Sequence, residues 1–253
     1  MTRLLAAAAA AALIGTAAQA LPVGGTGNVT PDVIFGSGND NGSFTGVQVG
    51  GLELGLRAKL RYNTSGMPEN TFNYDGGNLY EFEVGDGVAP ANRSIWNFEW
   101  SVNTDWNDWN GLSLDAYTFT IGVDTDPSLA VSQVTYDPLS ALSTGAYFGT
   151  NANGNGGTPF TPAGGIGAVD LTQFNVAQNS VNLGFLGIFA DPQLEGFFTI
   201  TLSAFDDLGA EVASTSINVR YGDVPPIPVP AALPLLATGL IGLGLAARRR
   251  RRA

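Results

Sequence analysis

All four tryptophans of the chain lie between residues 96 and 109. Trp106 and Trp109 stand among Asp and Asn residues in a predicted polar turn. In sugar-binding β-sandwiches, an exposed aromatic ring packs against the C–H face of a sugar while nearby amides and carboxylates bind its hydroxyls. Trp106 and Trp109 are therefore candidate glycan contacts, with ordinary packing at an exposed turn as the alternative. Trp96 and Trp100 share one phase of a strand and are predicted core residues.

Several short polar segments carry the oxygen ligands that calcium prefers, which number about six to eight per ion. They are residues 39–41, 105–108, 124–126 and 206–207. None completes an EF-hand pattern, and Asp and Asn are also the usual residues of tight turns. A structural calcium ion is one hypothesis and plain turn formation is the other, and the sequence does not select the ligands.

Three carboxylates lie on outward faces of predicted strands, where a glycoside hydrolase would need two of them about 5–10 Å apart. They are Glu81, Glu83 and Glu99. The alternative is that they pair with cations on a neighbouring strand. The chain has no histidine, which excludes Ser-His-Asp and Cys-His catalysis and imidazole metal sites. We therefore predict no enzymatic activity.

Arg57, Lys59 and Arg61 alternate along one strand and form a basic face in a strongly acidic chain. Such a face suits an anionic polysaccharide, or it guards an edge strand against aggregation. Lys59 is the only lysine of the chain, and the alternation predicts that it lies on a charged, solvent-exposed face.

Period-two alternation of apolar and polar residues predicts strands in most of the chain and no clear helix. The clearest segments are residues 52–62, 80–84, 96–102, 117–123, 198–204 and 213–221, and weaker ones are 131–136 and 181–189. The last two clear segments form a predicted antiparallel hairpin. Together they indicate one all-β body, residues 21–223, folded as an antiparallel β-sandwich of immunoglobulin-like or jelly-roll-like type. Residues 149–167 are rich in Gly and Asn and are predicted to form a mobile surface loop.

The predicted body contains all 22 acidic residues of the chain and few basic ones. This charge argues against nucleic acid as a partner. The chain has no cysteine, so an exported body must rely on its core instead of disulfides.

Residues 1–20 have the three parts of a signal peptide: Arg3, an Ala-rich apolar stretch, and Ala18-Gln19-Ala20 as an A-x-A cleavage site. The mature chain is predicted to begin at Leu21.

The other end of the chain reads as a membrane anchor. Residues 224–230 form a Pro-rich spacer, and residues 231–247 form an apolar run about 26 Å long as a helix, at about 1.5 Å per residue. Residues 248–253 follow as a cytoplasmic tail, in which five arginines end the membrane segment and hold the body outside. These are Arg248, Arg249, Arg250, Arg251 and Arg252. An ordinary single-pass C-terminal anchor is one alternative for this tail.

The order of proline motif, apolar helix and arginine block resembles the PEP-CTERM sorting signal in its VPLPA-type variant. The matching motif is Pro228, Val229, Pro230 and Ala231, where the commoner form has glutamate in place of Val229. The resemblance implies an exosortase-like processing enzyme, passage through the inner membrane, removal of the tail near the motif, and release to the surface or matrix of cells that make exopolysaccharide. Residues 35–39, 68–73 and 96–100 also resemble uncharacterised exported members, without implying an activity.

The sequence thus predicts an exported, non-enzymatic component of the cell surface or extracellular matrix. The alternative is a carbohydrate-binding module, calcium-dependent or not, and a glycoside hydrolase comes third.

Overall fold

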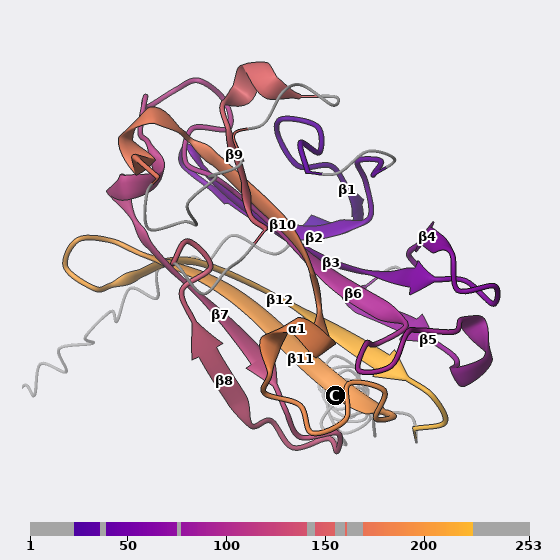
Figure 1. Cartoon of the computed structure of the whole chain (residues 1–253). Coiled ribbons are helices and arrows are strands. Elements are labelled where there is room, and N and C mark those ends of the chain that lie inside the picture. The colour runs from indigo at the N-terminus through magenta and orange to yellow at the C-terminus, as the bar shows by residue number, and fades with distance from the viewer. Residues whose placement is uncertain are drawn as a thin grey trace, which may run out of the picture.

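The computed structural model describes residues 23–35, 39–74, 77–140, 145–154, 160 and 169–224. These residues form two β-sheets that share one hydrophobic core (Figure 1). The predicted all-β architecture is confirmed. Within these ranges, no helix has the length and apolar character needed to span a membrane. The predicted signal peptide, sorting motif, apolar run and arginine block lie outside the described residues, as does most of the predicted loop at residues 149–167.

The larger sheet has seven strands, of which β3 and β6 lie at the centre. In spatial order they are β1 (Val23–Gly27), β2 (Phe44–Val49), β3 (Leu52–Tyr62), β6 (Trp96–Asn103), β10 (Val176–Asn182) and β9 (Tyr147–Gly149), with β4 (Pro68–Thr71) beside β3. All pairs in this sheet are antiparallel.

The smaller sheet has five strands. In order they are β5 (Leu79–Phe82), β12 (Glu211–Tyr221), β11 (Gly196–Phe205), β7 (Thr118–Asp124) and β8 (Gln133–Tyr136). The predicted hairpin is confirmed, because β11 and β12 pair antiparallel along their length, whereas β5 pairs parallel with β12. Short helical turns connect the strands: η1 (Val84–Asp86), η2 (Leu114–Ala116), η3 (Asn151–Asn153), η5 (Leu171–Gln173) and α1 (Leu183–Leu186).

Strand β6 supplies the largest side chains of the core. Trp96 and Trp100 are fully buried, as the alternation predicts, and the Trp96 ring stacks on Phe82 and packs against Phe198 of the smaller sheet. Truncating one such ring to alanine costs about 3–5 kcal/mol in a typical core. One face of β6 therefore contributes to the packing between the two sheets, and its other face carries the polar side chains of Asn97, Glu99 and Ser101.

The weak strand prediction over residues 181–189 is wrong. Strand β10 begins earlier, at Val176, and ends at Asn182, whose side chain accepts a hydrogen bond from the backbone of Gly184 and so caps α1. Gly187 then ends this helix with φ of 67°, a left-handed conformation that glycine adopts without steric cost. The capping residues at both ends override the apolar pattern of Leu183 to Phe189.

The predicted position of the basic face is also wrong. Strand β3 is central and not an edge, since it pairs with β2 and β4 along one side and with β6 along the other. Its outward face is not wet either, because Arg57 is fully buried and Lys59 is only 3% exposed. The edge-guard hypothesis therefore does not apply to these cations.

Candidate functional site

A buried charged cluster lies on the outer face of the larger sheet, and three residues form it. Arg57 and Glu99 are cross-strand partners on β3 and β6, with Nε of Arg57 2.6 Å from Oε2 of Glu99. Nζ of Lys59 lies 2.7 Å from Oε1 of the same carboxylate. The predicted pairing of Glu99 with these cations is confirmed, but the group is shielded from water.

Two phenyl rings enclose the guanidinium of Arg57. Its central carbon lies 4.2 Å from the centre of the Phe44 ring and 4.4 Å from that of Phe72. Nη1 also donates to the backbone carbonyls of Asp40 and Gly42, at 2.8 and 2.7 Å. This cation is therefore held by one carboxylate, two carbonyls and two aromatic faces, which fixes the position of Glu99 as well.

The charges in this cluster shift one another's protonation. Burial alone would raise the pKa of Glu99, but Arg57 and then Lys59 outweigh it and keep the pKa below its ordinary value. Burial lowers the pKa of Lys59, and the attraction of Glu99 only partly opposes this. Glu99 is thus an ionised carboxylate beside an amine that loses its proton more easily than an ordinary lysine.

Residues 29–35 and 39–42 cover this face of the sheet. The backbone N–H of Thr30 donates to Glu53, that of Ile34 donates to Gln178, and Nδ2 of Asn103 donates to the carbonyl of Thr30. Val29, Val33, Phe35 and Phe44 form a second hydrophobic cluster beneath it. The outer face of the larger sheet is therefore an interior surface over most of its length.

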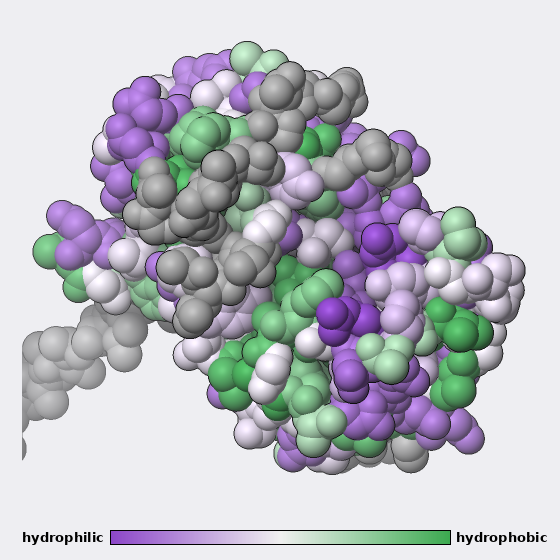
Figure 2. All heavy atoms as spheres, viewed as in Figure 1, coloured by the Kyte–Doolittle hydropathy of each residue, from purple (hydrophilic) through white to green (hydrophobic). Residues whose placement is uncertain are grey.

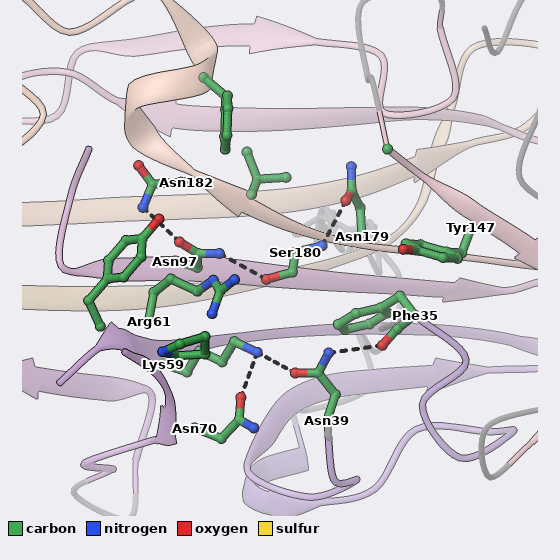
Figure 3. Close-up of a pocket in the computed structure, with 15 residues that line it drawn as sticks. Phe35, Asn39, Lys59, Arg61, Asn70, Asn97, Tyr147, Asn179, Ser180 and Asn182 are labelled. Atoms are coloured by element: carbon green, nitrogen blue, oxygen red, sulfur yellow. Dashed lines mark hydrogen bonds between the residues drawn. The ribbon is translucent and has the colours of Figure 1, made fainter. Parts of the chain in front are cut away.

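The cover leaves a groove of about 730 Å³ open beside the charged cluster. Its floor comes from β3 and β6, one wall from β4, and the other from β10 and α1. Polar side chains lie across it from wall to wall (Figure 3). In Figure 2, hydrophilic residues gather on the face where β3, β4 and β6 meet, beside apolar residues around α1.

Amide side chains are the most frequent polar lining of the groove. They are Asn39, Asn70, Asn97, Asn179 and Asn182. Asn182 donates to Asn97 at 2.8 Å, and Asn97 donates to Ser180 at 3.0 Å, so that these three residues form a connected row (Figure 3). The row is fixed by these bonds. Oδ1 of Asn182 already accepts from the N–H groups of Ser94 and Gly184, so the lone pairs that remain for a ligand are those on the oxygens of Asn97 and Ser180.

Arg61 extends into the middle of the groove, between this row and Lys59 (Figure 3). It is half-buried and lies 5.3 Å from the centre of the Tyr62 ring. In the described ranges, no carboxylate lies within ion-pair distance of its guanidinium. Four aromatic side chains also line the groove: Phe35, Tyr62, Tyr147 and Phe185.

The two predicted glycan-contact tryptophans lie away from this groove. They follow the C-terminal end of β6, whereas Asn97 near its N-terminal end lines the groove. Trp106 donates its Nε1 proton to the carbonyl of Gly50 at 3.1 Å, and Trp109 is 70% exposed. The Trp109 ring also lies next to Gly50, where an added Cβ would be 3.4 Å from it, so both rings lie at the turn between β2 and β3. The structure does not bring them together with the amide row.

In the loops considered for calcium, side-chain oxygens of Asp and Asn accept hydrogen bonds from nearby backbone N–H groups. Asp105 accepts from the N–H groups of Trp109 and Asn110, and Asp206 accepts from those of Leu208 and Ala210. Asp124 and Asn41 cap their loops in the same way. Across the described residues there is no group of three or more acidic, His or Cys side chains arranged for a metal ion. Turn formation accounts for these segments, and calcium binding remains an untested prediction.

Glu81 pairs with a cation other than those the sequence favoured. It lies on β5 in the smaller sheet, opposite Arg220 of β12, and forms an ion pair with it. Both side chains are partly exposed. The separation of the two sheets prevents Glu81 from meeting the basic face of β3.

No protein-family model matches the chain, and no curated protein matches it either.

Sequence reasoning missed most of the groove. Its walls come from β4, β10 and α1, of which β4 and α1 were not predicted and β10 was misplaced. A usable signal was present in β10, where Gln178, Ser180 and Asn182 alternate as polar residues that pair with Ser101, Glu99 and Asn97. Two matching polar rows on neighbouring strands indicate a covered or ligand-binding face, but only once the pairing is known.

Proposed function

We propose that this chain is an exported, non-enzymatic component of the cell surface or extracellular matrix whose body binds polysaccharide in the groove between β4 and β10. The groove itself is the observation that carries the proposal. It combines a fixed row of amides and a hydroxyl with aromatic rings at its margins. Sugars need donors and acceptors for their hydroxyls and flat apolar surfaces for their C–H faces.

Arg61 favours an acidic polysaccharide over a neutral one. Its guanidinium projects between the amide row and Lys59, and in the described part of the chain it has no carboxylate partner. A planar guanidinium binds a carboxylate through two parallel hydrogen bonds. A uronate residue would supply that carboxylate and also the hydroxyls that the amides require.

The hydrolase alternative is less well supported. Hydrolysis of a glycosidic bond needs two carboxylates about 5–10 Å apart. Among the described residues that line the groove, none is Asp or Glu. Glu99 lies below the surface and is bound to two cations.

Export and sorting remain part of the proposal on sequence grounds. Residues 1–20 would direct secretion, and the PEP-CTERM-like tail with Pro228 to Ala231 would be cut by an exosortase-like enzyme after passage through the inner membrane. The two sheets are compatible with an immunoglobulin-like or jelly-roll-like sandwich, architectures that are frequent among surface proteins.

Binding is tested by titrating the protein with a polyuronate and with a neutral β-glucan of similar length, using calorimetry. We expect tighter binding of the polyuronate. Arg61→Ala should weaken it by at least about tenfold, which corresponds to about 1.4 kcal/mol. Trp109→Ala is the matched control, since it removes an exposed aromatic residue outside the groove. Loss of binding in Trp109→Ala but not in Arg61→Ala would move the site to the tryptophan turn, and no binding of either polymer would reject the proposal.

Sorting is tested by the intact mass of the protein recovered from its native host, from cells and medium separately. A species that begins at Leu21 and ends within residues 225–231 is expected. A species that still carries Arg248 to Arg252 would contradict sorting and leave a membrane-tethered body.

A further inference from the structure

The only lysine of the chain lies beside two asparagine amides and one carboxylate, the kinds of group that can form an amide bond with its amine. Lys59 is 3% exposed, and its Nζ lies 2.8 Å from Oδ1 of Asn70 and 2.7 Å from Oε1 of Glu99. A second amide oxygen, Oδ1 of Asn39, also accepts from this amine (Figure 3). An amine, two carboxamides and a carboxylate thus meet in one shielded place.

We propose that Lys59 forms an intramolecular amide bond with the side chain of one of these two asparagines, Asn70 or Asn39, and that Glu99 carries the protons. The inference concerns the floor of the groove and does not depend on glycan binding.

The geometry supplies each requirement of the reaction. An uncharged lysine amine is a good nucleophile, and it is activated where burial or a neighbouring base removes its proton. Burial lowers the pKa of Lys59, and the Glu99 carboxylate is at the distance a general base needs. The amide carbon of each asparagine lies one bond beyond an oxygen that Nζ already contacts. Because the fold holds the amine and the amide in contact, two weakly reactive groups do not have to meet by diffusion before they react.

The step balances without any added reagent. Glu99 accepts a proton from the ammonium of Lys59, and the Nζ lone pair then attacks Cγ of the asparagine while the carbonyl electrons move to Oδ1. The tetrahedral intermediate returns those electrons, the Cγ–Nδ2 bond breaks, and Nδ2 takes up the proton held by Glu99. Glu99 then accepts the second proton that Nζ must lose and passes it to the departing ammonia, which leaves as ammonium. One C–N bond forms, one breaks, Glu99 returns to its carboxylate form, and nothing is oxidised or reduced.

Such a bond would attach β3 covalently to one of the segments that lie over the larger sheet. A link to Asn70 joins β3 to β4, and a link to Asn39 joins β3 to the segment that crosses the charged cluster. The chain contains no cysteine. A cross-link of this kind would give an exported protein the constraint on its unfolded state that a disulfide otherwise provides.

The test is the intact mass of the full-length chain, folded and then denatured. The expected mass is lower than the sequence mass by one ammonia. Because Lys59 is the only lysine, an amine-specific reagent should then find no ε-amine in the denatured protein. Digestion with an arginine-specific protease should release a branched peptide that joins Lys59 to Asn70 or to Asn39.

The controls separate this bond from succinimide formation, which also expels ammonia at Asn-Gly sequences. These are Asn41-Gly42, Asn110-Gly111, Asn153-Gly154 and Asn155-Gly156. Lys59→Arg keeps the cation and should restore the full mass, whereas a succinimide would persist in this variant. Asn70→Ala and Asn39→Ala identify the acceptor, since the branched peptide should be lost only in the variant that lacks the linked asparagine.

An intact mass equal to the sequence mass, with a reactive ε-amine on Lys59, would overturn the proposal if circular dichroism shows a folded β protein. A branched peptide that contains Lys59 would support it whether or not the polysaccharide binds.

Discussion

Two cross-strand acid–base pairs in this protein arise from the same strand pattern and differ in what lies over them. Glu99 pairs with Arg57 on the larger sheet, and both side chains are fully buried. Glu81 pairs with Arg220 on the smaller sheet, and these side chains are 34% and 29% exposed. In each case an acidic residue alternates with core residues and faces a basic one on the next strand.

The difference comes from the segments that pack on the outer face of each sheet. Residues 29–35, residues 39–42 and β4 lie over this part of the larger sheet, where Phe44, Phe72 and the backbone carbonyls of Asp40 and Gly42 contact Arg57, the partner of Glu99. The pair of Glu81 and Arg220 remains partly open to water. A buried ion pair becomes strongly destabilising when one partner is removed, whereas an exposed one contributes little. Removing the glutamate of the buried pair is therefore expected to lower the free energy of unfolding much more than removing the glutamate of the exposed pair.

The largest effect is expected for Glu99→Gln. The change preserves shape but leaves Arg57 buried without its counter-charge, which typically costs about 3–5 kcal/mol. Urea unfolding at neutral pH should show a lower midpoint with an unchanged slope. A loss below about 1 kcal/mol would mean that the buried pair behaves like an exposed one, and the comparison would fail.

The contribution of Glu99 should also depend on pH. Its pKa in the folded protein lies below the ordinary value of 4.5, so its stabilising effect is complete above that value and is lost as the pH falls through the folded-state pKa. The difference in unfolding free energy between the wild type and Glu99→Gln should therefore shrink on acidification from about pH 5 to pH 3. A difference that stays constant over this range would contradict the role of the charge.

A smaller effect is expected for Phe72→Leu, which keeps an apolar side chain over Arg57 but removes one of the two rings. Loss of a shielded cation–π contact should cost about 1–2 kcal/mol. Tyr62→Leu is the matched control, because Arg61 lies farther from that ring, at 5.3 Å. Equal losses in the two variants would indicate general packing and not the enclosure of Arg57.

The smallest effect is expected for Glu81→Gln, the same substitution as at Glu99 but in the open pair. Its cost should stay below about 1 kcal/mol and should decrease further at high salt, because solvent and ions already screen the charges. If Glu81→Gln lowered the unfolding free energy as much as Glu99→Gln, the shielding of one pair from water would not explain the difference between the two pairs.

Much of the strand structure could be predicted because the signal is local. Leu52, Leu54 and Leu56 alternate with polar residues, and successive side chains of a strand point to opposite faces. The same rule correctly assigned Trp96 and Trp100 to the core. It could not identify β4, which is short and polar. It also could not identify the end of β10, because the strand ends where Asn182 caps α1.

The sequence alone thus determined the all-β character, the inward phase of the main strands and the strongly acidic composition, because alternation and charge are properties of neighbouring residues. Only the tertiary structure decided that the basic face of β3 is buried, that Glu99 lies between two cations, and that the amides of Asn39 and Asn70 meet the single lysine. These contacts join segments that are not neighbours along the chain. Their energies depend on which segment excludes water from which face, and an alternating pattern specifies two faces without stating what covers either of them.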